Sequence, residues 1–132
     1  MTKFSKKSIA LFQEWTRYAD EDLDMAQLAL TEDGPPNQIC FHSQQAAEKY
    51  LKGITILYGG KFEKSHQLRY LLELACDFDL SFEELKDEAI FLTRFYIETR
   101  YPGDIPSFSR KNAEQAYAAV KKIKEFILKK IP

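Results

Sequence analysis

The fold is decided by residues 37–58, NQICFHSQQAAEKYLKGITILY. The stretch follows Pro35-Pro36 and stops at Gly59-Gly60, which are signals for the start and the end of a helix. At about 100° per residue its small and apolar side chains share one side, so the sequence predicts a helix packed against other helices. Gly53 lies at the edge of this core face, where it would let another backbone or a ligand approach closely. The core face consists of Ile39, Ser43, Ala46, Ala47, Tyr50, Ile54 and Leu57.

One edge of that core face carries polar side chains at steps of three, four and three residues, within an arc of about 80°. This polar stripe consists of His42, Gln45, Lys49 and Lys52. Imidazole, amide and ammonium groups in a row suit phosphate or the carboxylates of a partner. The structural alternative is that Lys49 and Lys52 are ordinary solvated charges, with Glu48 pairing Lys52 at i,i+4. In that alternative His42 is a hydrogen-bonded histidine at the edge of the core.

Segments of helical period extend on both sides of this central helix. Residues 63–65 and 77–79 are short links, so neighbouring helices are expected to be antiparallel. Ser81 and Glu84 have the spacing of a capping box. The sequence predicts a single all-α domain over residues 1–132, an up-and-down antiparallel bundle of four to five helices. The expected helices are residues 8–30, 37–58, a third that begins near Ser65, a fourth from Ser81 to just before Pro102, and 109–128.

The first expected helix carries an apolar stripe and an acidic cluster. The stripe has helical spacing and is expected to face the core. It consists of Leu11, Trp15, Tyr18, Asp22 and either Met25 or Ala26. The acidic cluster consists of Asp20, Glu21, Asp22 and Asp24. A solvated face is the ordinary interpretation of such a cluster, and a docking surface for a basic partner is the functional alternative.

Composition limits the classes of function. The 132 residues suit one domain, and 45% of them are hydrophobic, which is enough for a core. The formal net charge of -1 predicts no strong non-specific binding to nucleic acid. Cys40 and Cys76 lie among apolar neighbours and are expected to be buried, reduced thiols. The basic N-terminus precedes no sustained apolar run and no stretch is long enough to span a bilayer, so a cytoplasmic location is expected.

Three segments carry a resemblance to a known family. Residues 41–52, FHSQQAAEKYLK, resemble the signature helix of the HEPN family (higher eukaryotes and prokaryotes nucleotide-binding domain). Residues 65–68, SHQL, resemble the family's His-x-Leu element, and residues 100–102, RYP, resemble its Arg-Tyr-Pro element. The acidic start of residues 19–23 fits the family's first helix. The resemblance covers nearly the whole chain, with its elements in order.

The resemblance implies a helical bundle that forms a homodimer. It also implies a small nucleotidyltransferase as partner, often in a toxin–antitoxin-like module, and a nucleotide as ligand. Many members of the wider family are metal-independent ribonucleases, whose motif is an Arg followed after four to six residues by a His. That motif is absent here, because the only histidines are His42 and His66 and neither follows an Arg at that spacing. The resemblance therefore favours binding over cleavage.

The candidate binding residues combine the polar stripe with three residues further along the chain. His66 is expected in the first turn of a helix, where free backbone amides favour an anion, and its structural alternative is a hydrogen bond across the bundle. Arg100 is expected at a helix C-terminus, where the helix dipole favours a cation. The single Glu63-x-x-His66 copy is too little for a di-metal site, so no metal and no cofactor is expected. The candidates are His42, Gln45, Lys49, Lys52, His66, Arg100 and Tyr101.

Three functions remain open from the sequence. The first is a non-catalytic module that binds a nucleotide or phosphate and pairs with a nucleotidyltransferase. The second is a metal-independent ribonuclease with an atypical centre at His42 or His66, since histidine can act as general acid or base. The third is a structural, antitoxin-like subunit without a ligand.

Overall fold

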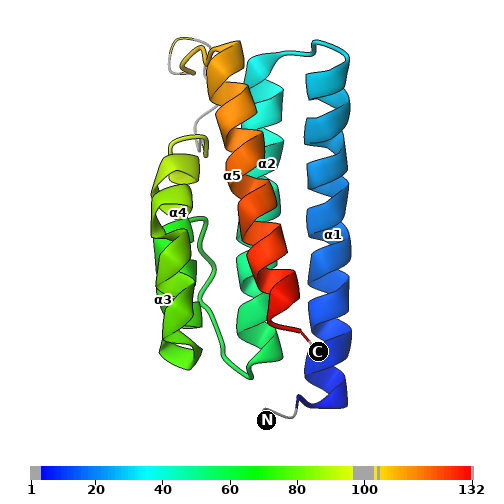
Figure 1. The fold of residues 1–132 in the computed structure, drawn as a ribbon, viewed down its shortest axis with the longest axis vertical. Coiled ribbons are helices and arrows are strands. Elements are labelled where there is room, and N and C mark those ends of the chain that lie inside the picture. Colours follow the sequence, from blue (N-terminus) through cyan, green and yellow to red (C-terminus); the bar gives the residue numbers. More distant parts are fainter. Residues whose placement is uncertain (1–3, 97–102, 104, 132) are drawn as a thin grey trace.

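A computed structural model describes residues 4–96, 103 and 105–131 of the chain. Within these residues all regular structure is helical, which confirms the predicted all-α class. Figure 1 shows α1, α2 and α5 as long neighbouring rods, with α3 and α4 on the side of α2 and α5 that faces away from α1. The helices are α1 (Lys6–Thr31), α2 (Pro36–Leu57), α3 (Leu68–Phe78), the 3-10 helix η1 (Leu80–Leu85), α4 (Lys86–Thr93) and α5 (Arg110–Lys129).

Helix α2 is the centre of the bundle, because it packs against α1, α3, α4 and α5. Every residue of its predicted core face is buried, so that prediction is confirmed. Contact with four helices extends the burial well beyond one face. A Cβ atom at Gly53 would lie 3.0 Å from the Cβ of Trp15, so the glycine permits the close approach of α1 that the sequence suggested. The residues buried in addition are Cys40, Gln44, Glu48, Leu51, Lys52, Gly53 and Thr55.

The predicted stripe of α1 is largely wrong, because the helix is rotated relative to the expectation. Its buried residues are Phe12, Ala19, Leu23 and Ala26, so of the two alternatives at the end of the stripe Ala26 is right. Leu11, Tyr18 and Met25 are exposed. Two stripes of helical period run along α1 next to each other, and burial selects the one whose alanines allow α1 to lie close to α2.

The direction of α3 also departs from the expectation. His66 lies beside Glu48 in the middle of α2, whereas Phe78 stacks on Tyr58 just past its end. Helices α2 and α3 therefore run the same way, as Figure 1 shows, because the link over residues 58–67 turns back along α2. The expectation of a short link at 63–65 is wrong because α3 begins at Leu68, three residues later than predicted.

The signals at the two ends of α2, Pro35-Pro36 and Gly59-Gly60, are confirmed, and of the three serines expected near helix starts one caps its helix and two do not. Ser109 caps α5 and exchanges hydrogen bonds with Asn112 in a capping box. Ser65 accepts a hydrogen bond from the amide of Gln67 (3.1 Å) without starting a helix. Ser81 does not cap the fourth helix either, because Asp79 accepts from the Ser81 amide and caps η1 instead. The expectation that this helix extends to just before Pro102 is wrong, because α4 ends at Thr93 and residues 94–96 are not helical. Residues 97–102 lie outside the described residues.

The two thiols differ in burial. Cys40 is fully buried, and burial raises the pKa of its thiol to about 11. Cys76 is only half-buried, and burial raises its pKa as well. No helix in the described part of the chain is both long and apolar enough to cross a membrane.

Asp79 predicts a pH-dependent contribution to stability. The Ser81 hydroxyl donates to this carboxylate (2.7 Å) and the Lys130 ammonium lies 3.0 Å away, so its pKa is lowered. A carboxyl with a lowered pKa stabilises the folded state above its unfolded-chain pKa, and the contribution disappears as the pH falls through the folded pKa. We expect Asp79→Asn to lower the free energy of unfolding at neutral pH by about 0.5–1 kcal/mol.

Urea denaturation at several pH values measures this effect. The gap between wild type and Asp79→Asn should close in strong acid. Asp77→Asn, at an exposed carboxyl two residues away, serves as the control and should change little. A gap that stays constant as the pH falls would contradict the role assigned to the Asp79 charge.

Candidate functional site

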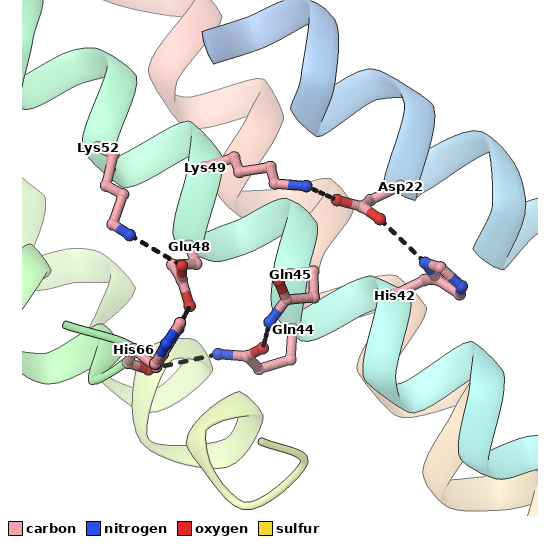
Figure 2. Close-up of polar contacts among 8 residues, drawn as sticks. All are labelled: Asp22, His42, Gln44, Gln45, Glu48, Lys49, Lys52 and His66. Atoms are coloured by element: carbon pink, nitrogen blue, oxygen red, sulfur yellow. Dashed lines mark hydrogen bonds and ion pairs between the residues drawn. The ribbon is translucent and has the colours of Figure 1, made fainter. Parts of the chain in front are cut away.

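Two carboxylates, those of Asp22 and Glu48, bind the basic side chains along α2, and they lie on either side of this helix (Figure 2). We call the part of α2 that carries these side chains its outer face. Each carboxylate binds the Nδ1 atom of one histidine with one oxygen and the ammonium group of one lysine with the other. We call these groups the Asp22 cluster (Asp22, His42 and Lys49) and the Glu48 cluster (Glu48, Lys52 and His66). Together they contain both histidines of the chain and both lysines of the polar stripe.

The Asp22 cluster joins α1 to α2. Asp22 Oδ1 lies 2.9 Å from His42 Nδ1, and Asp22 Oδ2 lies 2.5 Å from Lys49 Nζ. His42 and Lys49 are seven residues apart, two turns of helix, so both reach the same point on α1. The Asp22 side chain is only 13% exposed although it belongs to the acidic cluster. Its two cationic partners account for its burial, since a buried charge needs compensation.

The Glu48 cluster joins α2 to the segment that precedes α3. Glu48 Oε2 lies 2.9 Å from Lys52 Nζ, and Glu48 Oε1 lies 3.0 Å from His66 Nδ1. The side chains of Glu48 and Lys52 are 5% and 9% exposed, so this is a buried ion pair. The Lys52 ammonium also lies over the rings of Trp15 and Phe62, at 5.7 and 5.5 Å from their centroids.

His66 is fixed from two further directions. The Tyr96 ring stacks on its imidazole with centroids 4.3 Å apart. Gln44 donates from Nε2 to the His66 carbonyl (3.4 Å), and Gln45 donates from Nε2 to Gln44 Oε1 (2.7 Å). The amide pair lies between the two clusters in Figure 2, so polar groups continue across this face of α2. The His66 side chain itself remains 38% exposed.

The structure brings together five of the seven predicted site residues. Arg100 and Tyr101 lie outside the described residues. The other five share one face of the bundle, and the i,i+4 pairing of Glu48 with Lys52 is confirmed. That pair is buried, however, so the expectation that Lys52 is a solvated charge is wrong. His66 precedes the first residue of α3, so the argument from a helix N-terminus does not apply to it, and its alternative, a hydrogen bond across the bundle, is what the structure has.

The anchoring carboxylates are the site residues that sequence reasoning missed. The solvated face expected for the acidic cluster is wrong for Asp22. Asp20 is also engaged, because it accepts from the Tyr50 hydroxyl and lies 3.0 Å from Lys124 on α5. Burial and then that hydrogen bond raise the pKa of Tyr50 far above its usual range. The interruption of an apolar stripe by Asp22 is the one signal in the sequence that points to this role.

The clusters define which atoms remain for a ligand. A carboxylate that accepts from Nδ1–H sets the orientation and tautomer of the imidazole and leaves Nε2 as the open nitrogen. Nε2 of a neutral ring is an acceptor or general base, and Nε2–H of a protonated ring is a donor to phosphate or carboxylate. Lys49 is 28% exposed and has further N–H groups besides the one directed at Asp22. The face can therefore bind an anion or transfer a proton.

Comparison with known proteins places this chain in a family. The model of the HEPN domain matches residues 12–131, and the chain therefore belongs to the HEPN family. No curated protein matches the chain.

Two solved structures have the same fold. The crystal structure of TT1696 from Thermus thermophilus is 32% identical, with a TM-score of 0.73, over 91% of this chain and 98% of that one. ST0689, an archaeal HEPN homologue, is 23% identical, with a TM-score of 0.73, over 92% of this chain and 98% of that one. The second likeness shows the fold alone. The family resemblance found in the sequence is thus confirmed.

The buried Glu48–Lys52 pair predicts a large stability effect. We expect Glu48→Gln to lower the free energy of unfolding by about 3 kcal/mol, because it leaves the Lys52 ammonium buried without a counter-ion. The double variant Glu48→Gln with Lys52→Met removes that charge and should recover most of the loss. Chemical denaturation monitored by circular dichroism measures both. A loss below about 0.5 kcal/mol for Glu48→Gln would contradict the burial of this pair.

Proposed function

We propose that this chain is a non-catalytic HEPN module that binds a nucleotide or phosphate group on the outer face of α2. In this proposal it works in the cytoplasm as a homodimer and pairs with a small nucleotidyltransferase in a toxin–antitoxin-like system. The observation that carries the ligand part is the pair of histidines whose Nδ1 atoms are held by carboxylates, with Lys49 on the same face. The homodimer, the nucleotidyltransferase partner and the toxin–antitoxin-like system are proposed because the chain belongs to the HEPN family.

The charges of the two clusters favour an anionic ligand that contacts only a few side chains. Each cluster contains one carboxylate and one ammonium group, which balance, so a protonated histidine supplies the net positive charge. Phosphate oxygens accept well from imidazolium and ammonium groups. The stack of Tyr96 on His66 adds aromatic surface next to this position. Arg100 and Tyr101 belong to the proposed site through the family resemblance alone.

The ligand part is tested by calorimetric titration with inorganic phosphate and the four common nucleoside triphosphates. We expect His66→Ala and Lys49→Ala each to weaken binding about tenfold, the loss of one charge-assisted hydrogen bond. Lys122→Ala, which removes a half-exposed lysine that pairs with Glu88, serves as the control and should leave binding unchanged. Absence of binding at millimolar concentration of all five compounds would refute this part.

A second candidate is a metal-independent ribonuclease with an atypical centre. The observation that favours it is the same histidine–carboxylate pairing, which also positions a general base. Purified protein incubated with total RNA and a chelator separates the two candidates. The binding module leaves the RNA intact. The ribonuclease cleaves it, and it loses that activity in the double variant His42→Ala with His66→Ala.

A further inference from the structure

Both histidines of the two clusters turn the same ring nitrogen toward a carboxylate (Figure 2). His42 Nδ1 lies 2.9 Å from Asp22 Oδ1, and His66 Nδ1 lies 3.0 Å from Glu48 Oε1. An ionised carboxylate only accepts hydrogen bonds, so each Nδ1 carries a proton. In a neutral ring Nε2 then holds a lone pair, and it can accept a hydrogen bond but cannot donate one.

The lysines leave each cluster without net charge when its ring is neutral. Lys49 Nζ lies 2.5 Å from Asp22 Oδ2, and Lys52 Nζ lies 2.9 Å from Glu48 Oε2, so ammonium and carboxylate balance. An oxyanion that approaches a neutral ring therefore meets no net positive charge, and at Nε2 it meets a lone pair. With a protonated ring the same anion meets one net positive charge and an N–H donor. The protonated cluster is thus the form that attracts an anion.

The other groups around His66 do not replace this charge. Tyr96 stacks its uncharged ring on the imidazole, with centroids 4.3 Å apart. Glu63 and Lys64, just before His66 in the chain, are exposed and of opposite sign, so their fields largely cancel and solvent screens them. Gln44 donates to the His66 carbonyl and carries no charge. The imidazole is therefore the group whose protonation changes the charge of this cluster.

The surroundings of His42 lead to the same result. The ring of Phe41 meets the imidazole edge-to-face, with centroids 5.5 Å apart. On α1, Glu21 and Asp24 lie close to Asp22 in the sequence, but both are exposed. These solvated carboxylates add no cation to the cluster, and they repel an anion. Protonation of His42 is thus the step that gives the Asp22 cluster a positive charge.

We propose that an oxyanion bound at either cluster enters together with a proton. Nε2 of the neutral imidazole takes the proton from the solvent, so the ring becomes an imidazolium. Its Nδ1–H still donates to the carboxylate, and the new Nε2–H donates to an oxygen of the anion. The inference rests on the anion site of the proposed function, and it adds that the ligands include fully ionised oxyanions without an O–H group.

Proton uptake makes the affinity depend on pH in one direction. Histidine loses its proton near neutral pH, with a pKa of about 6.5 in an unperturbed chain. Below that range the ring is already charged, and the affinity is constant. Above it, each bound anion must bring one proton onto the protein, so the affinity falls about tenfold per pH unit. The site therefore releases its anion as the pH rises.

Calorimetric titration of the whole chain with sodium sulfate tests this coupling. Sulfate has the tetrahedral shape of phosphate, but it has no proton to give near neutral pH. Titrations at about pH 8 and constant ionic strength, in buffers of different ionisation enthalpy, count the protons taken up on binding. We expect about one proton per bound sulfate, and an affinity about tenfold lower for each pH unit above neutrality.

The variants His42→Gln and His66→Gln separate the two clusters. Glutamine places an uncharged amide N–H near the position of Nε2, and it cannot gain a proton. We expect each variant to remove the pH dependence at its own cluster only, and the double variant to bind sulfate weakly and without proton uptake. Lys122→Gln, which removes a half-exposed lysine that pairs with Glu88, is the control and should keep the full uptake. Circular dichroism checks that every variant is folded.

Each other outcome overturns a defined part. Sulfate that binds without proton uptake, and with equal affinity at all pH values, refutes the coupling and leaves the anion site standing. Phosphate that binds where sulfate does not, even at about pH 6, shows that the ligand brings its own proton to a neutral Nε2, and this also refutes the coupling. Uptake that persists in the double variant refutes its assignment to the histidines. If neither anion binds at any pH, the anion site of the proposed function falls, and this inference falls with it.

Discussion

The burial of the Glu48 carboxylate is the constraint on which the rest of the outer face depends. An ionised carboxylate that is 5% exposed costs several kcal/mol unless opposite charge and hydrogen bonds compensate it. Lys52 and His66 supply the opposite charge and the hydrogen bonds, and each of them makes further contacts. Lys52 lies against Trp15 and Phe62, and His66 fixes the segment that turns back along α2. The link between α2 and α3, and hence the direction of α3, follows from this compensation.

The Asp22 cluster repeats the arrangement on the other side of α2, and the repetition decides what the face can offer a ligand. In both clusters the ammonium group is already engaged with a carboxylate, so the lysines are not a free row of cations. Within the described residues, the imidazole nitrogens that these carboxylates do not bind are the Nε2 atoms of the two histidines. The candidate function of this HEPN chain therefore depends mainly on His42 and His66. Residue spacing along α2, by contrast, gives no reason to prefer one member of the polar stripe over another.

Much of the fold follows from local signals, and most of the site does not. The core face of α2 and the start of α5 at Ser109 depend on residues within a few turns of one another, and both were predictable. The glycine at position 53 also indicated a close approach, although only the structure shows that α1 makes it. The rotation of α1 was not predictable, because two neighbouring stripes have the same period and only tertiary packing chooses between them. Asp22 and Lys49 are 27 residues apart, and no local pattern pairs them. The start of α3 depends on His66 meeting Glu48, which is equally non-local.

The central claim is that carboxylates hold both imidazoles through Nδ1 and leave Nε2 open. Long-range nitrogen–proton correlation NMR of the histidine rings tests it most directly, because the two tautomers have distinct nitrogen shifts. At a pH where the rings are neutral, the account predicts that His42 and His66 both carry the proton on Nδ1, and that Asp22→Asn and Glu48→Gln each alter the tautomer of their own histidine only. Rings that carry the proton on Nε2, or that average freely between the two forms, would contradict it.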